Sequence, residues 1–135
     1  MRAVDQRAGS YTEFQAFVAG AAGRLLHVAV LLTGEPEPAR RLLAGALART
    51  YAHWARLRGD DPYDFTRQEL CAAFARTGRR HQGGHGVLAR LSPLERLVLV
   101  LRIYEGVAEE VTAAQLGLPA ERVRVLCNRA VAELR

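Results

Sequence analysis

The stretch from Leu91 to Arg135 most constrains the fold, because it holds three helical patterns separated by two glycine stops. The run Ser92-Pro93-Leu94-Glu95 is a capping box with proline at the first helical position, so a helix should begin there. Gly106 should end that helix, and a short helix over about Glu109 to Leu116 should follow. The run Gly117-Leu118-Pro119 predicts a tight turn that opens a helix to the C-terminus. Short helix, glycine turn and longer helix together predict a helix-turn-helix, with a plain three-helix bundle as the alternative.

The last helix is expected to have an inward apolar stripe and a mixed outward face, which includes Glu121 and is flanked by arginines. The inward positions follow the 3.6-residue period: Val123, Leu126, Cys127, Ala130, Val131 and Leu134. The outward and flanking positions are candidates for DNA binding: Arg122, Arg124, Val125, Asn128 and Arg129. Arginine side chains are suited to hold phosphates, and the amide of Asn128 is suited to a base edge. Because the possible phosphate contacts outnumber the base contacts, we expect DNA binding that is strongly salt-dependent.

The charge balance of the chain is basic. Its 135 residues include 19 Lys and Arg against 14 Asp and Glu, which gives a formal net charge of +5. Such an excess suits nucleic acid or an acidic protein surface and demonstrates neither. Cys71 and Cys127 fall at inward helical positions without a metal motif, which indicates small core residues in a reducing compartment. Because we find no apolar run of membrane-spanning length and no signal-peptide core, we expect a cytoplasmic protein without membrane contact.

Three further helical patterns precede the C-terminal stretch. Their apolar residues recur at three- and four-residue steps rather than in strand-like alternation, over about Thr12 to Leu32, Pro38 to Arg56 and Pro62 to Thr77. The first ten residues are expected to form a poorly ordered polar tail. The run from Gly78 to Gly86 has no apolar residue and is rich in glycine, so it should be a flexible linker.

These patterns predict an all-α chain made of two small helical units. The expected division is an N-terminal three-helix unit over residues 11–77, a linker over 78–90 and a helix-turn-helix unit over 91–135. Stable units of this size are expected to bury their apolar stripes within each unit or between the two.

No pattern in the sequence favours an enzyme, a metal site or a cofactor. His81 and His85 are four residues apart, but the glycines between them disfavour a helix that would align the two rings, so they are interpreted as solvated linker residues. The pair Asp60-Asp61 precedes Pro62 and is explained by helix capping. We recognise no glycine-rich phosphate loop, nucleophile elbow or HExxH motif.

Several runs resemble a bacterial RNA polymerase sigma factor of the extracytoplasmic-function type, particularly the short actinobacterial kind. In the N-terminal unit they are Leu31-Leu32-Thr33-Gly34-Glu35-Pro36, Ala46-Leu47-Ala48-Arg49-Thr50-Tyr51 with Trp54, and Asp60-Asp61-Pro62. In the C-terminal unit they are Leu91-Ser92-Pro93-Leu94-Glu95-Arg96, Val98-Leu99-Val100-Leu101-Arg102, Gln115-Leu116-Gly117-Leu118-Pro119, Arg129-Ala130 and Leu134-Arg135. The resemblance covers roughly residues 11–135, and the order and spacing of the runs are its most specific aspect.

The resemblance implies that the N-terminal unit binds the polymerase core and opens promoter DNA, and that the C-terminal unit reads a more distant promoter element. The partners would then be promoter DNA, RNA polymerase core and an anti-sigma or other regulatory protein. The family's core-binding helix carries an acidic pattern, whereas this chain has Ala39-Arg40-Arg41-Leu42-Leu43-Ala44-Gly45 there. The candidate polymerase-binding or partner-binding residues are Arg40, Arg41, Ala44, Gly45 and Arg49.

Two functions remain open at this point. The chain is either a sigma subunit that binds promoter and polymerase, or a degenerate sigma-like protein that regulates transcription through protein contacts. The arginines at positions 40 and 41 favour the second, because like charge at an interface opposes binding to a basic partner surface. The helix-turn-helix pattern favours the first.

Overall fold

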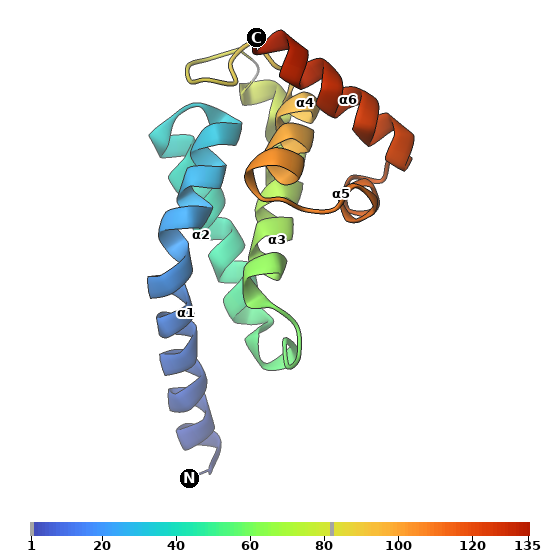
Figure 1. The fold of residues 1–135 in the computed structure, drawn as a ribbon. Coiled ribbons are helices and arrows are strands. Elements are labelled where there is room, and N and C mark those ends of the chain that lie inside the picture. Colours follow the sequence, from blue (N-terminus) through green and yellow to red (C-terminus); the bar gives the residue numbers. More distant parts are fainter. Residues whose placement is uncertain (1, 82) are drawn as a thin grey trace.

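The computed structural model describes residues 2–81 and 83–135, without the side chains of residues 2–8 and 79. This part of the chain contains helices and loops but no strand, which confirms the all-α class (Figure 1). The elements follow one another as α1 (Arg2–Thr33), α2 (Pro36–Ala52), η1 (Trp54–Arg56), α3 (Pro62–Thr77), η2 (Gly78–His81), α4 (Pro93–Leu99), η3 (Val100–Tyr104), α5 (Glu109–Leu116) and α6 (Ala120–Glu133). Of the η elements, η1 and η2 are 3₁₀ turns and η3 is a π-helical continuation of α4.

The first two helices differ from the predicted ranges. α1 begins at Arg2, because residues 2–11 contain no proline that would break the helix. The expectation of a poorly ordered polar tail is therefore wrong from Arg2 onward. Met1 lies outside the described residues. The second pattern is divided, since α2 ends at Ala52 and the chain passes through His53 into the separate turn η1.

The predicted helix starts at Asp61 and Ser92 are confirmed. The side chain of Asp61 accepts a hydrogen bond from the backbone N–H of Tyr63 at 2.9 Å, with proline at the first position of α3. At α4 the Ser92 hydroxyl accepts from the N–H of Glu95 at 3.2 Å, and the Glu95 carboxylate accepts from the N–H of Ser92 at 2.9 Å. This reciprocal pair satisfies two backbone donors that the helix itself leaves unbonded.

The segment Gly9–Thr33 of α1 is long and apolar enough to cross a membrane, by length and composition only. It has 25 residues, and its most apolar window of 18 residues has a mean hydropathy of 1.7, so the expectation that no apolar run approaches this length is wrong. A core helix of a soluble protein passes the same test, and one third of the most apolar window is buried within the protein. Leu25, Val28 and Leu32 are fully buried in contact with the other helices, which accounts for much of the apolar stripe.

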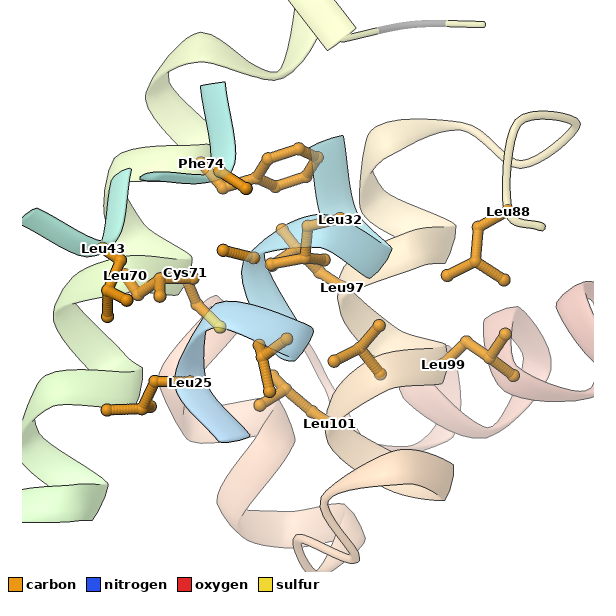
Figure 2. Close-up of a cluster of buried hydrophobic side chains, with 14 of the residues drawn as sticks. Leu25, Leu32, Leu43, Leu70, Cys71, Phe74, Leu88, Leu97, Leu99 and Leu101 are labelled. Atoms are coloured by element: carbon orange, nitrogen blue, oxygen red, sulfur yellow. The ribbon is translucent and has the colours of Figure 1, made fainter. Parts of the chain in front are cut away.

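The helices before and after the connecting segment share one hydrophobic core. α1, α2 and α3 pack as a bundle, and α4 packs against α1 and α3. Figure 2 shows Leu25 and Leu32 from α1 and Phe74 from α3 in the same cluster as Leu97 of α4 and Leu101 of η3. Burial of this apolar surface holds the two groups of helices together.

Arg96 holds the connecting segment in place, in contrast to the expectation of a flexible linker. Its guanidinium is 1% exposed and donates to six backbone carbonyl oxygens. The six acceptors, at 2.6 to 3.3 Å, belong to Leu32, His81, Gly83, Leu88, Ala89 and Leu91. The Leu88 carbonyl also accepts from the backbone N–H of Leu91. By donating to all six carbonyls, the buried cation fixes the path of the segment.

The same segment also lies against the turn between α1 and α2. A Cβ atom on Gly34 would stand 2.0 Å from the carbonyl oxygen of His85, and the backbone of Gly34 has φ of +78°. Both the close approach and the left-handed conformation therefore require glycine at this turn.

A buried carboxylate makes a second connection between the two groups of helices. The side chain of Glu105, directly after η3, is fully buried. Its Oε1 accepts from the Tyr63 hydroxyl at 2.7 Å and from Arg67 Nη1 at 3.1 Å, and its Oε2 accepts from Arg24 Nε at 3.1 Å. We call these four residues the Glu105 cluster; it joins α1 and α3 to the C-terminal helices.

Candidate nucleic-acid interface

The turn between α5 and α6 has the predicted helix-turn-helix geometry. Gly117 ends α5 in the left-handed conformation, with φ of 68° and ψ of 35°. The N–H of Leu118 then donates to the carbonyl of Ala113 at 2.9 Å, and Pro119 precedes the first residue of α6. A side chain at position 117 would be strained in this conformation, which explains why glycine marked the turn in the sequence.

A small hydrophobic cluster fixes the orientation of α6 on the rest of the C-terminal unit. Val123 and Leu126 of α6 are buried with Val98 of α4 and Ala113 of α5. Ala130 is fully buried in the larger core. The expectation that Leu134 faces inward is wrong: it is 42% exposed, because α6 ends at Glu133 and Leu134 forms its cap.

The five predicted DNA-binding residues all lie on the exposed side of α6: Arg122, Arg124, Val125, Asn128 and Arg129. Val125 is 48% exposed, so this side includes an apolar position as well as polar ones. Within the described part of the chain, Arg122, Asn128 and Arg129 make no side-chain hydrogen bond or ion pair. Their donors are therefore free to meet an external acceptor.

Arg124 differs from its neighbours because it is already paired. Its Nε and Nη2 donate to the two carboxylate oxygens of Glu109, at 3.1 and 2.8 Å, across the turn from α5. These hydrogen bonds lower the pKa of Glu109, and the carboxylate in turn raises the pKa of Arg124. A phosphate that approaches Arg124 must compete with the carboxylate of Glu109 in this bidentate ion pair.

The predicted partner-binding residues of α2 differ in exposure: some face solvent, and Arg49 faces the neighbouring helix α3. Arg40, Arg41 and Ala44 are exposed, and Arg40 is ion-paired with Glu37 on the same helix. Gly45 is half-buried beneath the guanidinium of Arg49, since a Cβ at Gly45 would lie 3.6 Å from Arg49 Nη1. Arg49 also faces Glu69 of α3 at 3.7 Å. The side of α2 that is open to a partner therefore contains Arg40, Arg41 and Ala44 but only part of Arg49.

Sequence reasoning missed the two residues that position the C-terminal unit, Arg96 and Glu105. Both are in phase with buried apolar residues: Arg96 lies four positions before Val100, and Glu105 lies four positions after Leu101. This spacing could have predicted that both residues are buried and paired, because a charged residue on the inward side of a helix needs partners. The interpretation of His81 as a solvated residue is also wrong, since its ring stacks on Phe74 with centroids 5.5 Å apart.

Comparison with known proteins identifies the family. Residues 87–135 match the sequence family described as "Sigma-70, region 4". The RNA polymerase sigma-E factors of Streptomyces coelicolor and Streptomyces avermitilis are each 30% identical to this chain, over alignments that cover 94% of this chain and 86% of the relative. The chain belongs to the extracytoplasmic-function sigma factors. A third relative, the sigma-E factor of Streptomyces antibioticus, is 30% identical over 94% of this chain and 85% of its own length. No solved structure matches the chain.

The family match confirms the resemblance and places the helix-turn-helix of this sigma factor within region 4. The matched residues contain α4, η3, α5 and α6 together with Leu88 and Leu91, which bind Arg96 through their carbonyls. Similarity to the Streptomyces relatives extends over nearly the whole chain and so includes α1 to α3.

Proposed function

We propose that this sigma factor directs transcription initiation by binding promoter DNA through α6 and RNA polymerase core through the open side of α2. The observation that carries the proposal is the exposed set of Arg122, Asn128 and Arg129 on a helix-turn-helix that matches region 4. We assign core binding and promoter melting to residues 11–77, the connection to 78–90, and promoter reading to 91–135. The protein would act in the cytoplasm, without a cofactor.

The DNA-binding half of the proposal is tested on the full chain with duplexes selected from a random pool. Arg129→Ala should weaken binding to every duplex and lower the salt slope by about 1, because it removes one phosphate contact. Asn128→Ala should instead change the order of preference among duplexes, because an amide reads base edges. An affinity that stays the same between about 50 and about 200 mM salt would contradict the proposal.

The polymerase-binding half is tested by co-purification with core polymerase. Arg40 and Arg41 replace the acidic residues of the family pattern, so the unmodified chain should bind core less tightly than a sigma factor with carboxylates there. The double change Arg40→Glu and Arg41→Glu should strengthen retention of core. If the unmodified chain already binds as tightly as an acidic relative, these arginines do not limit binding.

A second function is supported by a specific observation on α3. Phe74 is the only aromatic residue near the end of this helix, and it is fully buried, so it offers no surface on which an unpaired base could stack. This favours a sigma-like protein that regulates transcription through protein contacts, with an anti-sigma factor as one possible kind of partner. In vitro transcription separates the two: a sigma subunit makes core polymerase promoter-specific, whereas a degenerate regulator changes the activity of another sigma factor without doing so.

A further inference from the structure

A hollow of about 360 Å³ opens between the start of α2, the end of α3 and the connecting segment. We call it the cationic hollow and define it by the lining residues Arg41, Arg80, His81, Thr77 and Glu35. Its volume falls within the usual range for small-ligand sites. Its lining residues include none of α6, the helix proposed to read DNA.

The two arginines of the cationic hollow are not engaged within the protein. Arg41 and Arg80 are exposed, and neither makes a hydrogen bond or ion pair with any residue that the structure describes. Arg40, the neighbour of Arg41, is by contrast paired with Glu37. Each free guanidinium keeps its planar fork of N–H donors, which matches the oxygens of a phosphate better than a single ammonium group does.

The imidazole of His81 is held in the wall of the cationic hollow. Its ring stacks on Phe74 with an interplanar angle of 18°, and its Nε2 is 3.5 Å from the Thr77 hydroxyl. Its backbone carbonyl accepts from Arg96 Nη1 at 2.6 Å, which brings a third guanidinium group behind the wall. Burial lowers the pKa of His81, the charge of Arg96 adds to this effect, and Glu35 opposes it. The charges of Arg80 and Arg41 act in the same direction as Arg96. Among the lining residues, two guanidinium groups stand against one carboxylate, so positive charge is in excess.

We propose that the cationic hollow binds the phosphate group of a small ligand such as a nucleotide. Arg41 and Arg80 would donate to the phosphate oxygens, and the Thr77 and His81 side chains would line the base of the site. Glu35 would oppose the anion and limit the affinity. The proposal does not rest on the proposed function, because it requires neither a promoter nor polymerase.

The test uses the full chain and two probes that separate the sources of phosphate. Binding of inorganic pyrophosphate is measured by calorimetry, and binding of an oligothymidylate about 12 nucleotides long by fluorescence anisotropy. Arg41→Gln and Arg80→Gln should each weaken binding about tenfold, because each removes charge-assisted hydrogen bonds. Glu35→Gln should strengthen binding, because it removes the one carboxylate. Arg76→Gln is the matched control, since Arg76 is exposed in the last turn of α3, does not line the hollow, and changes the net charge equally.

The pattern across variants decides the outcome. Pyrophosphate binding that Arg41→Gln weakens about tenfold and Arg76→Gln leaves intact supports a site for a free phosphate ligand. The same pattern with the oligonucleotide alone would reflect the single-strand binding expected of the N-terminal unit in this family, and it overturns the proposal. Equal weakening by Arg76→Gln and Arg41→Gln, or no binding of either probe at about 1 mM, overturns the proposal. Arg41 and Arg80 are exposed, and unchanged thermal unfolding of these variants would show that a loss of binding is not a loss of folding.

Discussion

The Nη1 atom of Arg96 lies 3.0 Å from the carbonyl oxygen of Leu32, although the two residues are 64 positions apart in the sequence. This hydrogen bond joins the last turn of α1 to α4. The other donors of the same guanidinium hold the connecting segment, so one buried cation sets the position of the helix-turn-helix relative to the N-terminal bundle. Burial lowers the pKa of Arg96, because loss of water disfavours the charged form of the guanidinium.

Replacement of Arg96 should destabilise the protein strongly. Arg96→Met keeps the length of the side chain but leaves several buried carbonyls without a donor, each at a cost of about 1–3 kcal/mol. We expect the free energy of unfolding in urea to fall by at least about 3 kcal/mol. Arg90→Met is the control, because Arg90 is exposed in the same segment. A loss below about 1 kcal/mol for Arg96→Met would show that water replaces the guanidinium without penalty.

Tyr63 and Glu105 should be energetically coupled. The Tyr63 hydroxyl donates to a fully buried carboxylate, and Glu105 also binds Arg67, whose side chain is 8% exposed. In a double-mutant cycle with Tyr63→Phe and Glu105→Gln, we expect a coupling free energy of about 1–2 kcal/mol. Additive effects of the two changes on unfolding in urea would mean that the hydrogen bond does not contribute to stability.

The local structure was predictable from the sequence because its signals are local. Ser92 with Glu95 predicted the start of α4, and Gly117 predicted the end of α5, since capping and left-handed turns depend on a few neighbouring residues. The connecting segment was not predictable in the same way. Its glycines indicate a flexible chain, and the residue that orders it, Arg96, lies outside the segment and acts through backbone carbonyls that carry no sequence signal.

The candidate nucleic-acid interface was also predictable only where the signal in the sequence is local. The exposure of Arg122, Asn128 and Arg129 was predictable from the 3.6-residue spacing of the apolar residues in the sequence of α6. The pairing of Arg124 with Glu109 does not, because the two residues are 15 positions apart on different helices. Which arginines are free and which are occupied is therefore a property of the tertiary structure.

The two cysteines should differ in reactivity, which reports on the contact between α3 and α4. Cys71 is 5% exposed and lines a hollow with Leu94 and Leu97, and burial raises its pKa to about 12. Cys127 is half-buried on α6. Burial also raises the pKa of Cys127, but this thiol is partly accessible. A thiol reagent at neutral pH should therefore modify Cys127 more slowly than a free thiol, and Cys71 only after urea is added. Fast modification of Cys71 in the native protein would indicate that the two groups of helices separate.

Stability should depend on pH through His81. Because burial lowers its pKa in the folded protein, the unfolded chain takes up a proton at a higher pH, near its ordinary value of about 6.5. The free energy of unfolding should therefore fall as the pH drops below about 6.5, and level off below the folded pKa. His81→Gln should flatten this dependence, whereas His85→Gln, at an exposed position of the same segment, should not. Equal slopes for His81→Gln and the unmodified chain in urea titrations at several pH values would contradict this.

Release of Arg124 from Glu109 should strengthen DNA binding. In the unmodified chain the carboxylate accepts from Nε and Nη2 of the arginine, so a DNA phosphate must compete with it for these donors. Glu109→Gln removes the competing charge, and we expect affinity for all duplexes to rise about fivefold at low salt, with a salt slope larger by about 1. Glu110→Gln changes the net charge equally on the same helix and is the matched control. If Glu110→Gln raises affinity as much, or if Arg124→Ala fails to abolish the gain in the Glu109→Gln background, the effect belongs to overall charge and not to this ion pair.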